Sequence, residues 1–229
     1  MTDASPAGDE RLILLLVGAA GAGKGTQAAA LSTELGLPHL ASGNLFRAAL
    51  AARTPVGEQA RGYMERGELV PDEITIRMFM EELDAPAAER GAILDGFPRT
   101  VGQARALDET LAAHGERVRR VVFIDVPDEV LVRRLAGRWV CPTCGTPYHE
   151  ETDPPRVAGR CDNDGAPLTQ RDDDRPEVVR ARLEQQVAPM LEVVDHYEAA
   201  GVVERVDGAQ PIEAVTDEIL ARLRTAAGA

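Results

Sequence analysis

The 229-residue chain carries 38 acidic and 25 basic residues, a formal net charge of −13. Such acidity argues against a nucleic-acid partner, because phosphate backbones attract basic surfaces. No apolar run reaches the roughly 18 residues that cross a membrane, and residues 1–10 are polar and acidic, unlike a secretion signal. Three cysteines cannot all pair within one chain, which disfavours a secreted disulfide scaffold. We therefore expect a cytoplasmic protein with no membrane contact.

Short apolar runs alternate with helical patterns along the chain, after a predicted disordered extension at residues 1–10. Strands are predicted at 12–17, 37–40, 91–94, 120–126 and 202–206. Helices are predicted at 24–35, 100–113, 128–136, 176–199 and 211–226. The alternation favours an α/β fold, a five-stranded parallel sheet with helices on both faces. Pro189 is predicted to kink or split the helix at 176–199.

A glycine-rich turn joins the first predicted strand to the first predicted helix. Its spacing, Gly18-x4-Gly23-Lys24, is that of a P-loop, with Gly25 inserted before Thr26. The N–H groups of such a loop surround phosphate oxygens, and the helix N-terminus adds partial positive charge. Lys24 is the only lysine, since every other basic residue is arginine. An ammonium is compact and a guanidinium is a wide fork, so this site needs a small cation. The pattern predicts a nucleoside triphosphate site.

Two stretches interrupt the alternation. Residues 41–70 read as short helices rich in arginine and glycine, and residues 137–174 hold all three cysteines. Both are predicted to be lobes inserted over the ligand edge of the sheet, which leaves 11–40, 71–136 and 175–229 as the core.

The cysteines have zinc-ribbon spacing. Cys141-x2-Cys144 is followed after sixteen residues by Cys161-x2-Asp164, so an aspartate replaces the fourth cysteine. A closed tetrahedral set predicts a structural Zn²⁺, which would stabilise a lobe with few apolar residues. Asp162 and His149 compete for the fourth position, and a metal-free lobe with reduced thiols is the alternative to a zinc site.

Three segments together resemble adenylate kinase. They are the P-loop with Gln27, the segment Ser42-Gly-Asn-Leu-Phe-Arg47, and the run Leu94-Asp-Gly-Phe-Pro-Arg-Thr100, whose signature is the most specific of the three. The resemblance covers about residues 11–226, and segment 137–174 matches the long lid of bacterial members. It implies a P-loop kinase fold, an AMP-binding lobe at 41–70, a lid at 137–174, and Mg²⁺-dependent transfer of the γ-phosphoryl group of ATP to AMP, giving two ADP.

The resemblance also implies roles for individual residues. ATP would be bound by Gly21, Ala22, Gly23, Lys24, Gly25, Thr26, Arg134, Arg138, Pro147, Tyr148 and Gln210. AMP would be bound by Ser42, Arg47, Glu68, Leu69, Val70, Gly96, Phe97, Pro98, Arg99, Gln103, Arg171 and Arg182. The transferred phosphoryl group would be stabilised by Lys24, Arg99, Arg134, Arg138, Arg171 and Arg182.

The residue types suit this chemistry. Two nucleotides placed phosphate to phosphate concentrate negative charge, which converging arginines can neutralise bidentately. Phosphoryl transfer depends on positioning and charge stabilisation, so no nucleophilic side chain is needed. Asp95 follows a buried strand beside the P-loop, where a carboxylate can orient Mg²⁺ or its waters, although it could instead cap the next helix. The amide of Gln103 can pair with an adenine edge.

Two positions depart from the family pattern. Family members commonly have proline where this chain has Ala20, so we expect a slightly looser loop. They commonly have aspartate where this chain has Asn44, so we expect weaker Mg²⁺ affinity. Other readings are the same chemistry with GTP as donor or UMP as acceptor, or a non-catalytic ATP-sensing zinc module. The arginine set argues against the sensor, which would need only the P-loop. A monomer is expected, because no apolar surface stripe stands out.

Overall fold

One parallel sheet organises the chain in the computed structural model, which describes residues 11–65, 70–170, 174 and 176–225. The predicted extension 1–10 lies outside the described residues. The strand order is β2-β3-β1-β4-β7, and every neighbouring pair is parallel. The strands are β1 (Leu12–Val17), β2 (His39–Ala41), β3 (Gly91–Asp95), β4 (Val118–Asp125) and β7 (Val203–Asp207). The predicted five-stranded α/β fold is confirmed, and no strand end differs from its predicted position by more than two residues.

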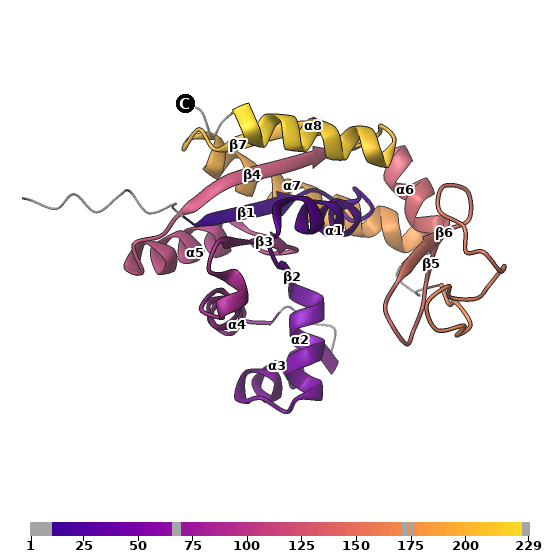
Figure 1. Ribbon diagram of the computed structural model, residues 1–229, viewed down its shortest axis with the longest axis horizontal. Coiled ribbons are helices and arrows are strands. Elements are labelled where there is room, and N and C mark those ends of the chain that lie inside the picture. Colours follow the sequence, from indigo (N-terminus) through magenta and orange to yellow (C-terminus); the bar gives the residue numbers. More distant parts are fainter. Residues whose placement is uncertain (1–10, 66–69, 171–173, 175, 226–229) are drawn as a thin grey trace, which may run out of the picture.

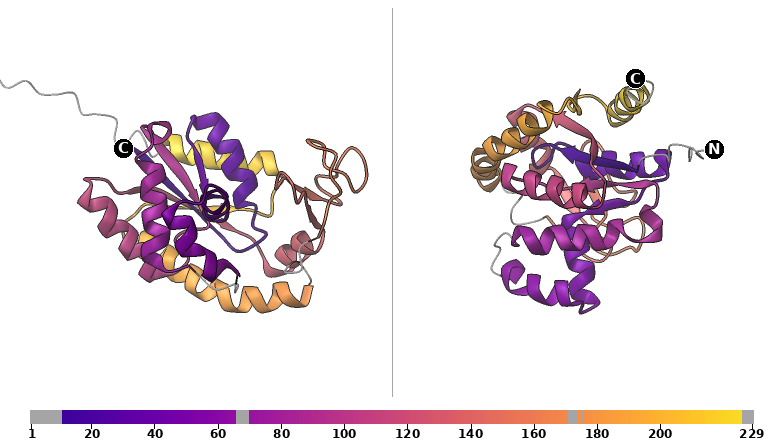
Figure 2. Two further views of the ribbon diagram at one scale, coloured as in Figure 1. Left: turned by 90° about the horizontal axis from the view of Figure 1, so that it is seen from below. Right: turned by 90° about the vertical axis from the view of Figure 1, so that its left-hand side faces the viewer.

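Helices cover both faces of this sheet (Figures 1 and 2). They are α1 (Lys24–Leu35), α2 (Ser42–Ala51), α3 (Pro55–Glu65), α4 (Asp72–Leu83), α5 (Val101–Ala113), α6 (Asp128–Ala136), α7 (Pro176–Glu198) and α8 (Ile212–Thr225), with a 3-10 turn at Pro86–Ala88. None of the helices in the described part is long and apolar enough to span a membrane.

The central strand β1 divides the interior into two cores. Ile13 and Leu15 pack with buried residues of α4, α5 and the C-terminal part of α7, whereas Leu14 and Leu16 pack with α1, α6, α8 and the N-terminal part of α7. Successive side chains of a strand point to opposite faces, so an unbroken apolar run fills both cores at once. Burial on both faces holds the C-terminal end of β1, and the loop after it, in a fixed place.

Helix α7 is continuous across Pro189, so the predicted split does not occur. Proline removes one backbone hydrogen bond and disfavours a helix locally. Val179 and Leu183 before it are buried in one core, and Val193 and Val194 after it are buried in the other. Anchoring on both sides of the proline keeps the two halves in one helix.

Two further elements were not predicted as such. The first is α4, which buries Phe79 and Leu83. The second is an antiparallel hairpin of β5 (Arg138–Val140) and β6 (Pro147–His149), which continues directly from α6. In Figure 1 the pair α2 and α3 extends below the sheet, and the hairpin with its loops lies at the far end of α6.

Candidate active site

The P-loop links β1 to α1 as predicted. Gly21 and Gly23 have φ of 85° and 97°, a left-handed conformation that favours glycine. Lys24 begins α1, and its ammonium donates hydrogen bonds to the carbonyl oxygens of Gly18 at 2.7 Å and Ala19 at 3.0 Å. The compact cation therefore lies inside the loop. The turn that it closes leads into a helix N-terminus with no side-chain cap, a geometry suited to phosphate oxygens.

Asp95 ends β3 beside this loop. A Cβ added at Gly25 would lie 3.8 Å from Oδ2 of Asp95, so the carboxylate faces the start of α1. The same Oδ2 lies 3.2 Å from Nε2 of His39, on the neighbouring strand β2. The structure thus places the carboxylate predicted to serve Mg²⁺ next to the P-loop, held from the other side by an imidazole.

The predicted AMP residues of β3 and α2 meet at the same edge of the sheet. The guanidinium of Arg99 donates from Nε to the carbonyl of Gly96 at 2.8 Å and from Nη2 to Oγ of Ser42 at 3.5 Å. Ser42 in turn donates to the carbonyl of Gly96 at 3.2 Å. The turn between these residues includes a cis peptide bond from Phe97 to Pro98. These five predicted residues form one connected group.

Two other predicted AMP residues already have protein partners. Gln103 is buried; its Oε1 accepts from the N–H of Arg99 at 2.7 Å, and its Nε2 donates to Asp72 at 2.8 Å. Arg47 donates from Nη2 to the amide oxygen of Asn44 at 2.6 Å. Asn44, one of the two departures from the family pattern, therefore presents a neutral acceptor to this arginine.

The two described arginines near the lid stand on α6 and just after it. Arg134 donates to the carbonyl of Gly208 at 2.8 Å, and its pKa is lowered mainly by burial and also by Arg133. Arg138 makes a bidentate pair with Asp174, with Nε at 2.8 Å from one oxygen and Nη2 bonded to the other. Asp174 is fully buried, so this ion pair anchors the base of the hairpin.

The remaining predicted ATP residues lie in the turn before α8 and on strand β6. Gln210 donates to the carbonyl of Asp207 at 3.2 Å and to Glu218 at 3.0 Å. Pro147 is exposed on β6. Tyr148 differs from expectation, because its side chain is buried inside the hairpin lobe and donates to Sγ of Cys161 at 3.4 Å. Its side chain packs with the cysteines and not on an open surface, since β6 alternates between the two faces.

Several predicted positions lie outside the described residues. They are Glu68, Leu69 and Arg171, and the side chain of Arg182. Val70 is partly buried and packs against the core. Lys24, Ser42, Asp95 and Arg99 lie near one edge of the sheet, and the nucleotide roles of all the predicted residues stay predictions.

The cysteine lobe brings four candidate ligands together. One ligand atom from each of Cys141, Cys144, Cys161 and Asp164 lies within 4.8 Å of the others. Two sulfurs are 3.5 Å apart and an Asp164 oxygen is 3.3 Å from a third, close to the ~3.8 Å between sulfurs on tetrahedral Zn²⁺. These atoms can hold a tetrahedral metal, and their closed arrangement leaves no position for catalysis.

Neither competitor for the fourth ligand position joins the cluster. Asp162 accepts from the backbone N–H of Arg156 at 2.9 Å. His149 packs against Gly137, and its Nδ1 accepts from two backbone N–H groups at 3.1 and 3.3 Å. Asp164 is thus the fourth member by position.

Hydrogen bonds favour the charged forms of two of the four candidate ligands, Asp164 and Cys144. The N–H of Ala166 is the main cause that lowers the pKa of Asp164, and the hydroxyl of Thr146 is the main cause that lowers the pKa of Cys144. Burial raises the pKa of Cys141. The bond to Cys161, followed by burial, raises the pKa of Tyr148 to about 12, so this tyrosine remains a donor to the sulfur. Deprotonated sulfur and carboxylate are the forms that bind zinc.

Comparison with known proteins agrees with this geometry. A family model for adenylate kinase matches residues 16–202. The chain is 48% identical to an adenylate kinase of Exiguobacterium sibiricum over 210 residues, which is 92% of this chain and 98% of the relative. It is 45% identical to that of Brevibacillus brevis, over 92% and 99% of the two chains. It is 42% identical to that of Staphylococcus aureus, over 90% and 96%.

The chain belongs to the adenylate kinase family. The signature at Asp95 to Thr100 lies in the structure between the P-loop and the helix that carries Ser42, where an adenylate kinase must bring its two nucleotides together.

Three partners of the site residues escaped the sequence analysis. His39 contacts Asp95 from 56 residues away, Asp72 contacts Gln103 from 31 away, and Asp174 contacts Arg138 from 36 away. Only their positions could have indicated these contacts: His39 lies next to the end of a predicted strand, and Asp174 lies in the predicted lid. Pairings at such separations depend on the tertiary fold of this adenylate kinase.

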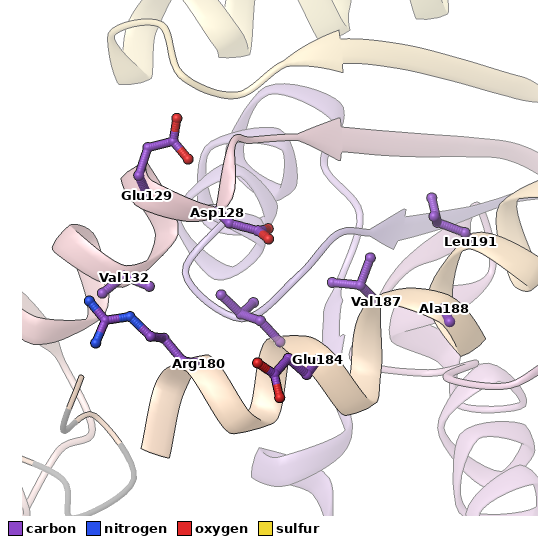
Figure 3. A pocket seen from close by; sticks show the side chains of 9 residues that line it. Asp128, Glu129, Val132, Arg180, Glu184, Val187, Ala188 and Leu191 are labelled. Atoms are coloured by element: carbon purple, nitrogen blue, oxygen red, sulfur yellow. The ribbon is translucent and has the colours of Figure 1, made fainter. Parts of the chain in front are cut away.

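A cavity of about 670 Å³ opens between α6 and α7, away from the residues assigned to nucleotides (Figure 3). Asp128 and Glu129 of α6 and Arg180 and Glu184 of α7 stand at its sides, over an apolar floor that includes Val187. None of the predicted nucleotide residues whose side chains the structure describes lines it. Lys24, Ser42 and Asp95 lie instead near the C-terminal ends of the strands, where ligands bind in open α/β sheets.

Proposed function

We propose that this chain catalyses the reversible transfer of the γ-phosphoryl group of ATP to AMP, giving two ADP. The proposal rests on one observation: two groups of residues suited to binding phosphate lie close together at one edge of the sheet. The P-loop, closed around Lys24, belongs to the donor, and the group of Ser42, Gly96 and Arg99 belongs to the acceptor. Membership of the adenylate kinase family supports the same reaction.

The proposed donor site uses backbone as much as side chains. The N–H groups of 21–26 and the N-terminus of α1 hold the β- and γ-phosphates, and Lys24 neutralises their charge. Gln210 borders the adenine, and Arg134 and Arg138 approach the phosphates from the side of the lid. Pro147 and the backbone of Tyr148 complete the lid side of the ATP site.

The proposed acceptor site holds AMP so that a phosphate oxygen is in line with the γ-phosphorus. Arg47 and Arg99 bind the AMP phosphate, and Gln103 borders the adenine. We assign Glu68 to Val70, Arg171 and Arg182 to the same site by family resemblance. The attacking group belongs to the substrate, so these residues position it and stabilise charge but form no covalent bond.

Asp95, beside the P-loop, has the chemistry to bind the Mg²⁺ that the family resemblance implies. Asp95 offers a hard carboxylate oxygen beside Gly25, which is the chemistry that Mg²⁺ prefers for itself or its waters. When bound, the ion neutralises charge on the β- and γ-oxygens. His39 lies against Oδ2 of Asp95, and the uncharged amide oxygen of Asn44, which stands where family members commonly have aspartate, accepts from Arg47.

The proposed lid is segment 137–174, and its metal is Zn²⁺ held by Cys141, Cys144, Cys161 and Asp164. When bound, Zn²⁺ cross-links the two knuckles, so that the lid moves as one body. Closure excludes water, which would otherwise compete with AMP as the acceptor. Adenylate kinase lids are an established example of such closure. Lobe 41–70 and the lid then face each other across the core of a monomer.

A coupled assay that detects nucleoside diphosphates tests the reaction. The expected result is rapid turnover of ATP with AMP in the presence of Mg²⁺, and little without it. Turnover of GMP or UMP as fast as AMP would overturn the assignment of the acceptor, and equal rates with GTP would overturn that of the donor. Tight ATP binding without turnover of any pair would favour the non-catalytic ATP sensor.

A further inference from the structure

Gln27 is a buried amide that the reaction described above does not use. It follows the P-loop directly, in the first turn of α1, and only 3% of its surface is exposed. A buried amide costs free energy unless its donor and acceptor are both satisfied. Its partners should therefore explain why it is there.

Both amide atoms of Gln27 bind the start of α8, more than 180 residues away. Nε2 donates to the carbonyl of Ile212 at 3.0 Å, and Oε1 accepts from the hydroxyl of Thr216 at 2.7 Å. A carbonyl can only accept, so the partner at Ile212 fixes which way the amide points. This pair of bonds ties the first turn of α1, directly after the phosphate loop, to the start of α8.

Directly before α8 lies the turn 207–211, which connects β7 to α8 and carries Gln210. Its other side is also held. Gly208 donates to the carbonyl of Asp125 at 2.8 Å and accepts from Arg134 at 2.8 Å, and a Cβ at Gly208 would lie 2.4 Å from Ile124. The turn has no room to shift toward β4, so Gln27 sets its distance from the P-loop.

We propose that Gln27 is a positioning residue for ATP, which fixes the spacing between the phosphate loop and the turn that borders the adenine. This inference rests on the proposed function, in which Gln210 borders the adenine of the donor. A ligand that binds the phosphate loop and the adenine turn at once gains affinity only if these two subsites are held at the distance that matches the ligand. AMP binds at Ser42 and Arg99, which lie on other elements, so it gains nothing from this tie.

The structure offers a variant that removes the tie and spares the fold. In Gln27→Met an unbranched side chain of similar length fills the space. The hydroxyl of Thr216 also lies 3.0 Å from the carbonyl of Ile212, so the two groups left behind satisfy each other. Thr216→Val removes the same tie from the other side, whereas Thr216→Ser keeps the hydroxyl and serves as the matched control.

The decisive measurement is binding by titration calorimetry, with ATP and with inorganic tripolyphosphate. We expect Gln27→Met to raise the Kd for ATP about tenfold, the loss of one well-formed buried interaction, and to leave the Kd for tripolyphosphate within about twofold. Thr216→Val should resemble Gln27→Met, and Thr216→Ser should resemble the unaltered protein. In the coupled assay the KM for ATP should rise while the KM for AMP stays constant.

Other outcomes separate this inference from the proposed function. If the unaltered protein binds ATP but turns over no nucleotide pair, the reaction is wrong, and the calorimetry still decides the role of Gln27. If Gln27→Met and Thr216→Val both bind ATP as the unaltered protein does, the proposal that Gln27 positions ATP is wrong. Equal weakening of ATP and tripolyphosphate would also overturn it, since Gln27 would then shape only the phosphate loop. A parallel rise in the KM for AMP would show a general structural defect.

Discussion

Gly137 lies between the end of α6 and the start of the hairpin of β5 and β6. Substituting it tests how closely the chain packs at this junction. Its φ is −89°, a value that any residue adopts, so only space requires glycine. A Cβ at this position would lie 2.6 Å from Nε2 and 2.8 Å from Cε1 of His149. Ordinary contacts begin near 3.4 Å, so the ring or the backbone must move by about 0.8 Å.

The imidazole has little freedom to make that movement. Nδ1 accepts from the N–H groups of Glu151 and Thr152, and Nε2 is buried with no hydrogen-bond partner among the described residues. Overpacking of this kind costs about 1–3 kcal/mol. We therefore expect Gly137→Ala to destabilise the lid by that amount.

Trp139, the only tryptophan, lies on β5 two residues from the substitution, so its fluorescence reports on the lid. Denaturant unfolding followed by this signal should show an earlier transition for Gly137→Ala. Adding His149→Ala should restore most of the loss, because it removes the ring that the new methyl group meets. Gly102→Ala is the matched control, since its Cβ would meet only Thr100 Oγ1, at 3.8 Å. An unfolding transition that is unchanged in Gly137→Ala, or that His149→Ala does not restore, would refute the steric conflict between a Cβ at position 137 and the ring of His149.

Three further predictions concern other parts of the chain. The protein purified without chelator should hold about one zinc per chain by elemental analysis, and Asp164→Ala should hold it more weakly; zinc-free protein would contradict the Cys₃Asp assignment. Lys24→Arg should fold normally but lose most turnover, because a planar fork cannot replace an ammonium bonded to two loop carbonyls, and near-normal turnover would contradict this. Burial and, next, the Asp108 carboxylate raise the pKa of Tyr197, so its contribution to stability is complete below the unfolded value near pH 10 and is lost as pH rises above it. Unfolding of Tyr197→Phe should therefore depend less on pH in that range, and identical profiles would refute the assignment.

Local sequence patterns predicted the parts of the fold that local forces determine. The run 12–17 reads as a strand buried on both faces, and the glycines and Lys24 specify the turn after it, because few other residues allow that backbone. Helix α4 was missed although Asp72 and Glu73 in its first turn are a helix-start signal, and its apolar side chains Phe79 and Leu83 are buried in the core. At Pro189 the local rule predicted a kink or a split; the split does not occur, because residues on both sides of the proline are anchored in the cores.

The candidate metal ligands and the partners of the site residues show what local sequence patterns cannot predict. Spacing alone placed three cysteines and Asp164 together, since each knuckle is a short local turn. It could not decide against His149, whose place depends on how β6 packs on the end of α6. Contacts such as His39 with Asp95, which join strands far apart in sequence, follow from the order of strands in the sheet and not from any local pattern.

The partners of the arginines suggest an order for recruiting them to the nucleotides. Arg47 donates to an amide and Arg134 to a backbone carbonyl, and both are neutral acceptors. Arg138 instead pairs with the buried carboxylate of Asp174. Hydrogen bonds to ionised groups are about twice as strong as neutral ones, so a phosphate displaces the first two partners more readily than it displaces Asp174. Under the proposed assignment Arg138 is therefore harder to recruit than Arg47 or Arg134, and its release from Asp174 would accompany the proposed closure of the lid over ATP.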